Sequence, residues 1–116
     1  MDHLVKARDW NEIISFYEDM TKRNSRFEKL LNLVNHINDN DLSKRLYAYT
    51  SVYYLIISIY NQIVINKETL TISPNGKDGL WNFKYNPQPY AKPEHERQYD
   101  GDLIKHFTNY IQMLKW

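Results

Sequence analysis

The sequence contains no cysteine and only three glycines in 116 residues. The absence of cysteine excludes disulfides, thiolate nucleophiles and cysteine-based metal sites. A strong charge of one sign is missing as well, because fifteen basic side chains balance fourteen acidic ones to a net charge of +1. No global field therefore draws the protein to nucleic acid or to an anionic membrane.

Long apolar runs are also missing. A membrane-spanning helix needs about 20 consecutive apolar residues. The longest apolar stretch, residues 46–60, is shorter and includes five tyrosines, two serines and a threonine. The first ten residues lack the apolar stretch of about 7–15 residues that a secretory signal requires. We therefore expect a cytoplasmic protein that forms a single globular domain over residues 1–116.

Catalytic and metal-binding motifs are absent too. The sequence has no H-E-x-x-H pair, no G-x-S-x-G nucleophile and no glycine-rich phosphate loop. The four histidines match no familiar ligand spacing; they are His3, His36, His95 and His106. We predict that the protein is not an enzyme and holds no cofactor or metal. A small enzyme or metal protein built on His95 and His106 is the third option for function.

Residues 46–60 read LYAYTSVYYLIISIY, with no charged side chain. Two interpretations compete, because short apolar runs form buried helices or buried strands and Val, Ile, Thr and Tyr favour strands. Length and an N-cap at Asp41 favour a helix, which we place at residues 42–60 as the centre of the fold. Its buried side chains are expected to be Tyr49, Val52, Tyr53, Ile56 and Ile59.

Apolar periodicity predicts three further helices. The first covers residues 9–22, and the second begins at a capping box formed by Ser25 and Glu28. The last is capped by Asp100 or Asp102 and runs to the C-terminal end of the sequence.

Alternating side chains predict a β-hairpin over residues 69–85, around an Asn-Gly and an Asp-Gly turn signal. Residues 63–65 either add a third strand or finish the central helix. Three prolines between residues 86 and 101 predict a long irregular strap. The expected fold is thus mainly α with a small β-hairpin, of the α+β class, in a compact four-helix arrangement that consists of the buried central helix and the three others around it.

The strap is the predicted partner-binding surface. Its stretch EHERQYDGD holds four acidic residues against one arginine, and aromatic rings lie beside them. Charge steers the encounter with a basic surface, and aromatic rings supply binding hot spots. The predicted partner-binding residues are Tyr90, Glu94, Glu96, Tyr99, Asp100 and Asp102.

The composition also suggests a class of function. Richness in Asn, Ile, Lys and Tyr is typical of an AT-rich gene, and hence of mobile bacterial DNA. We predict a non-catalytic binding protein, an immunity protein or antitoxin that neutralises a nuclease-type toxin by direct binding. The predicted partner is this toxin or another basic protein, and not a membrane; nucleic acid is disfavoured. The alternative is a phage or mobile-element protein that binds a host enzyme or nucleic acid.

Overall fold

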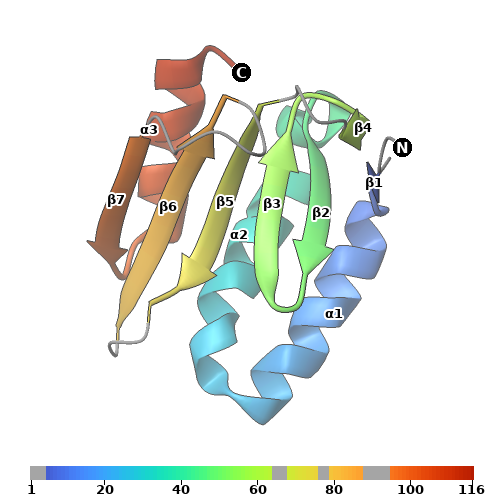
Figure 1. Ribbon diagram of the computed structural model, residues 1–116. Helices are drawn as coiled ribbons and strands as arrows, with labels where there is room; N and C mark the ends of the chain where they lie inside the picture. The colour runs from blue at the N-terminus through green and yellow to red at the C-terminus, as the bar shows by residue number, and fades with distance from the viewer. Residues whose placement is uncertain (1–4, 64–67, 76–78, 88–94) are drawn as a thin grey trace.

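One antiparallel sheet and three α-helices form two layers (Figure 1). The structure, a computed structural model, describes residues 5–63, 68–75, 79–87 and 95–116. The fold is of the α+β class, and the predicted four-helix arrangement is wrong, because a five-stranded sheet takes the place of the central helix.

The sheet has the strand order β2-β3-β5-β6-β7, with every neighbouring pair antiparallel. Its strands are β2 (Tyr47–Ser51), β3 (Tyr54–Ser58), β5 (Thr69–Pro74), β6 (Leu80–Asn86) and β7 (His95–Asp100). Two short strands, β1 (Val5–Lys6) and β4 (Gln62–Ile63), pair with each other beside β2. Within the described chain, β7 is therefore an edge strand of the large sheet.

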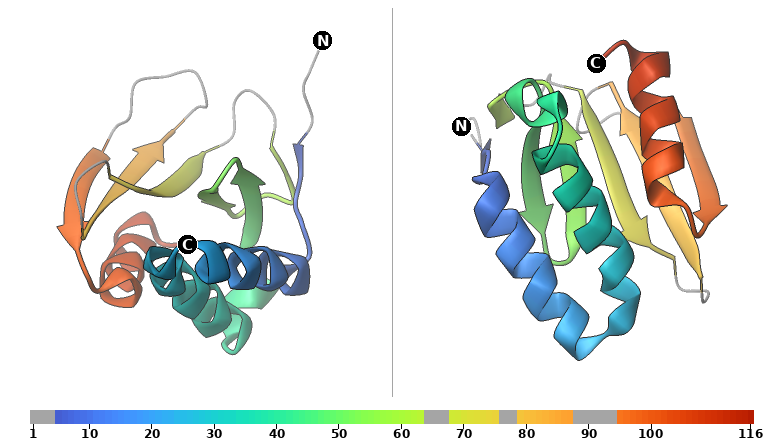
Figure 2. Two further views of the ribbon diagram at one scale, coloured as in Figure 1. Left: turned by 90° about the horizontal axis from the view of Figure 1, so that it is seen from below. Right: turned by 180° about the vertical axis from the view of Figure 1, so that it is seen from behind.

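The three helices cover one face of the sheet (Figure 2). They are α1 (Trp10–Arg23), α2 (Glu28–Asn38) and α3 (Leu103–Leu114). α1 and α2 form an antiparallel pair joined through the 3₁₀ turn η1 (Ser25–Phe27), and a second 3₁₀ turn, η2 (Asp41–Lys44), leads from α2 into β2. The core lies between the two layers, where Leu30 and Leu33 of α2 and Ile57 of β3 are fully buried.

The segment predicted as a central helix at residues 42–60 is a β-hairpin. β2 and β3 pair across a two-residue turn at Val52 and Tyr53, and β3 also pairs with β5 on its other side. β3 carries apolar side chains on both faces, with Leu55 and Ile57 buried and Ile56 half-buried, so its sequence lacks a clear alternation and imitates a buried helix. The strand interpretation that we set aside is correct. Of the side chains expected in the core, Tyr49 is buried, whereas Val52 is 79% exposed.

Other sequence predictions are confirmed. α1 begins after Asp9, whose carboxylate accepts a hydrogen bond from the Asn11 amide, and α3 begins after Asp102. The hairpin predicted for residues 69–85 is the β5–β6 pair. The capping box of Ser25 and Glu28 is wrong: the side chain of Asn24 caps the 3₁₀ turn that precedes α2.

The irregular strap predicted for residues 86–101 is wrong over its last part. Residues 95–100 form β7, which pairs with β6 over its full length. Residues 88–94 of the strap lie outside the described chain, as do residues 64 and 65; Ile63 belongs to β4. The extent of the single predicted domain stays a prediction.

Candidate partner-binding surface

β7 sorts the predicted partner-binding residues onto two faces of the sheet. Tyr99 lies opposite Trp81 on β6, and both side chains face the helices. Side chains alternate along a strand, so Glu96 and Asp100 lie on the face that points away from the helices. Both are exposed.

Tyr99 is half-buried in an aromatic cluster rather than free on the surface. Its ring stacks on the imidazole of His106, with 3.9 Å between centroids, and meets Phe83 edge-on at 5.2 Å. It also lies edge-on to Tyr110 of α3. Tyr99 therefore attaches β7 to α3, and it presents part of its ring to solvent.

The acidic side chains differ in their partners. Glu96 lies opposite Lys84 in the β6–β7 register, and their charged groups are 3.7 Å apart. Within the described chain, Asp100 and Asp102 form no ion pair. Asp102 is compensated in another way, because its carboxylate caps the positive N-terminal end of α3.

The connection from β7 to α3 holds Asp100 and Asp102 in place. The Asp102 amide donates to the Asp100 carbonyl at 2.8 Å, across Gly101, whose φ of +54° is a left-handed conformation that suits glycine. The Asp102 carboxylate accepts from the Lys105 amide at 3.1 Å and thereby caps α3. The backbone at this corner is thus fixed before any partner arrives.

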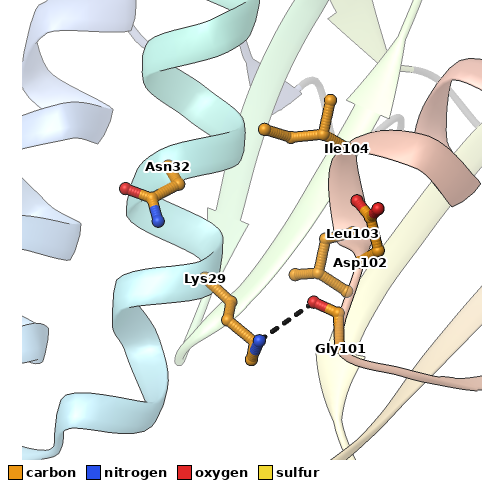
Figure 3. A pocket seen from close by; sticks show the side chains of 6 residues that line it. All are labelled: Lys29, Asn32, Gly101, Asp102, Leu103 and Ile104. Carbon is orange, nitrogen blue, oxygen red and sulfur yellow. Dashed lines mark hydrogen bonds between the residues drawn. The ribbon is translucent and has the colours of Figure 1, made fainter.

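α2 also supports this corner. A pocket of about 240 Å³ separates α2 from the start of α3, and at its mouth the Lys29 ammonium donates to the Gly101 carbonyl at 3.0 Å (Figure 3). Because Asp102 already caps α3, the helix start inside the pocket has less attraction for an anion. The hydrogen bond from Lys29 instead ties the acidic corner to the helical layer.

The structure therefore brings Glu96, Asp100 and Asp102 together along β7 and its continuation into α3. We call these three residues the acidic edge. Tyr90 and Glu94, the other two predicted partner-binding residues, lie outside the described chain. Exposed carboxylates on the outer face of β7, with a further one at the start of α3, can attract a basic protein surface and accept hydrogen bonds from its arginines and lysines.

The end of the sheet that holds Asp100 carries a second feature, which the sequence did not reveal. The register places Leu80 opposite Asp100 and Ser51 opposite Tyr54, so the β7–α3 connection and the β2–β3 turn lie at the same end (Figure 1). We call this the turn end. No glycine, asparagine or aspartate occupies the β2–β3 turn, so the usual signal for a tight hairpin is missing.

Two histidines have side-chain contacts within the described chain. His106 stacks on Tyr99, and the Nδ1 of His36 lies 3.5 Å from the side-chain amide of Asn40. Across the described ranges, no three His, Asp or Glu side chains are grouped as metal ligands. Among the helices described, none is long and apolar enough to cross a membrane.

Comparison with known proteins gives no relative from which a function could be transferred. No family model matches the chain, and no match was found among curated proteins or solved structures. The function is therefore inferred from the chemistry of the acidic edge and of the turn end.

Proposed function

We propose that the protein is a non-catalytic binding module, an immunity protein or antitoxin that neutralises a nuclease-type toxin in the cytoplasm by direct binding. The observation that supports it most is the fixed position of Asp100 and Asp102 at the exposed edge of the sheet, with no ion pair inside the described chain. Neither carboxylate has to break an ion pair of the described chain when a basic partner approaches.

A nuclease needs a basic cleft, because its substrate carries one negative charge on every phosphate. An acidic protein surface can occupy such a cleft in place of the substrate. Steering between opposite charges also makes association fast, which suits an inhibitor that must capture its toxin before the toxin acts. The acidic edge lies on a strand and a helix start rather than on a long loop, so little entropy is lost when it binds.

Capture of the toxin tests the proposal. The candidate toxin is the product of the gene next to the one that encodes this protein. The tagged protein is mixed with this purified gene product, and the fraction of the gene product that is retained is measured at low and high salt. We expect the wild type to retain it, and the double variant Glu96→Lys, Asp100→Lys to retain far less. Asp102 is left unchanged because its loss would remove the cap of α3.

A matched control separates a local effect from a change in net charge. Glu18 in α1 and Asp39 after α2 are exposed acidic residues outside the acidic edge. The variant Glu18→Lys, Asp39→Lys therefore changes the net charge by the same amount and should retain the toxin as the wild type does. Equal retention by the acidic-edge variant would exclude this edge from the interface, and no retention by the wild type would contradict the proposed function.

A further inference from the structure

The turn between β2 and β3 has an unusual residue at its tip. Val52 has φ = +56° and is 79% exposed. A β-branched residue is a rare outlier at positive φ, and two-residue hairpin turns normally use glycine, asparagine or aspartate there. A valine side chain in this position gains nothing for the fold, because it is in water. Strain of this kind often marks a functional site.

Buried contacts hold the strained turn in one conformation. The hydroxyl of Tyr17, a fully buried residue of α1, donates to the Tyr53 carbonyl at 3.1 Å. The Tyr53 ring meets Phe27 edge-on at 5.8 Å and Tyr54 at 5.1 Å. We call Val52, Tyr53 and Tyr54 the hairpin tip. Its backbone is attached to the helical layer, so its exposed groups are preorganised for binding.

The hairpin tip exposes two large hydrophobic side chains. Val52 is 79% exposed and Tyr54 is 40% exposed. Beside the tip lies a groove of about 380 Å³, and Tyr53 forms part of its wall. The other lining residues are Met20, Asn24, Arg26, Phe27 and Pro74. An exposed apolar residue next to a groove with a mixed polar and apolar lining is a shape that can interlock with a protein surface.

The hairpin tip and the acidic edge are close enough to serve one partner. Asp100 and Asp102 are at the turn end, Glu96 is four residues further along β7, and β3 and β7 are three strand intervals apart in the sheet. Neighbouring strands are about 4.8 Å apart, which gives a separation of about 15 Å. An interface of ordinary size covers about 800 Å² on each protein, so it spans such a distance.

We propose that the hairpin tip is the apolar anchor of the interface, with Val52 entering an apolar pocket on the same basic protein that the acidic edge attracts. This inference rests on the proposed function and adds the second recognition element. The acidic edge supplies steering, and the tip supplies the short-range contact that slows dissociation. Charge complementarity with the acidic edge identifies the occupant as a protein with a basic rim around its pocket.

Two substitutions at Val52 test the anchor. Val52→Asn removes the apolar side chain and suits positive φ, so it should raise the Tm while weakening affinity for the neighbouring-gene product about tenfold. Val52→Thr keeps the branched shape and the strain, so it should leave the Tm near that of the wild type and weaken affinity as well. The measurements are calorimetric melting of the free protein and titration calorimetry with the purified partner.

The matched control is Met113→Asn on α3, because Met113 is another exposed apolar side chain, at 53%. It should leave affinity unchanged. If both Val52 variants bind as the wild type does while the acidic-edge variant binds weakly, the anchor is wrong and the proposed function stands. If the wild type does not bind the neighbouring-gene product, both are wrong.

Two other occupants of the tip are distinguished in the same series. Binding of the wild type to anionic phosphatidylserine vesicles, lost in Val52→Asn, would overturn the anchor in favour of membrane contact. Dimerisation in sedimentation experiments that Val52→Asn abolishes would overturn it in favour of a second copy of this chain. A drop in the Tm of Val52→Asn would also count against the anchor, because it would show that valine at this turn serves folding.

Discussion

Tyrosine hydroxyls connect α1 and α3 to the sheet, and a third one connects two segments within the sheet layer. Tyr17 and Tyr49 donate to the backbone carbonyls of Tyr53 and Tyr60, and Tyr110 is hydrogen-bonded to Tyr99. Burial raises the pKa of all three phenols, to about 12 for Tyr49, where the nearby Tyr47 also contributes. A tyrosine in this setting fills the core with its ring and directs a chain segment with its hydroxyl.

These raised pKa values predict a loss of stability in alkaline solution. The folded protein keeps the phenol protons that the unfolded chain releases above a pKa of about 10. These groups therefore leave the free energy of unfolding unaffected below about pH 10. Between the unfolded-state pKa of about 10 and the raised folded-state pKa, each tyrosine lowers the free energy of unfolding by about 1.4 kcal/mol per pH unit. Urea midpoints measured from pH 8 to 12 check this. Tyr49→Phe should have a shallower decline, and an equal decline would contradict the assigned cause.

The bond from Tyr17 to the hairpin tip makes a separate prediction. Tyr17→Phe removes the donor to the Tyr53 carbonyl and should lower the free energy of unfolding by about 0.5–1.5 kcal/mol. Tyr54→Phe is the control, because Tyr54 is partly exposed at the same tip. Denaturant unfolding measures both. A Tyr17→Phe variant as stable as the wild type would show that this bond does not hold the turn.

At the scale of elements, the sequence was informative where periodicity and turn residues agreed. The amphipathic stripe of α1 and the Asn-Gly and Asp-Gly signals between β5 and β6 led to correct predictions. The hairpin of β2 and β3 was missed because Val52 and Tyr53 carry no turn signal, and because β3 is enclosed by β2 and β5. The β2–β3 hairpin depends on pairing with a strand that is distant in the sequence, and local propensity carries no information on such pairing.

The edge strand β7 was missed for a different reason. Its residues Glu96, Arg97, Gln98 and Asp100 are exposed, so no apolar alternation marks them as a strand. Charged residues are common on edge strands because they discourage pairing with other chains. The composition predicted which acidic residues form the acidic edge. The extended conformation of β7 and the inward position of Tyr99 depend on pairing with β6, which the composition does not reveal.

Two adjacent isoleucines test the strand assignment of β3. Ile57 is fully buried and faces the helices, whereas Ile56 is half-buried on the opposite face. Ile57→Ala should therefore lower the free energy of unfolding by about 2–5 kcal/mol, and Ile56→Ala by clearly less. Denaturant midpoints and slopes give both values. A larger loss for Ile56→Ala would contradict the alternation and hence the register of β3.

At the scale of the whole molecule, the net charge of +1 conceals an uneven distribution. At the edge strand, Asp100 and Asp102 form no ion pair within the described chain, whereas Glu96 is paired with Lys84, and ion pairs such as Arg8 with Glu12 and Lys22 with Asp19 compensate charge along α1. Local fields of this kind steer association, although the molecule as a whole is close to neutral.

This distribution predicts a salt-dependent association rate. The rate constant for binding the neighbouring-gene product should fall steeply between low and physiological ionic strength, because screening shortens the reach of the acidic edge. The variant Glu96→Lys, Asp100→Lys should associate slowly at low salt and respond less to added salt. Stopped-flow fluorescence measures the rates. Identical salt dependence in both proteins would show that the acidic edge does not steer the encounter.

Inhibition of a nuclease is the sharpest test of neutralisation by direct binding. The purified product of the neighbouring gene is assayed on nucleic acid while this protein is added in steps from zero to several equivalents. Neutralisation by direct binding predicts that nuclease activity falls in proportion to the added wild-type protein and reaches zero near one equivalent. The same amount of the variant Glu96→Lys, Asp100→Lys should leave much of the nuclease activity. Undiminished nuclease activity at several equivalents of the wild type would contradict the claim.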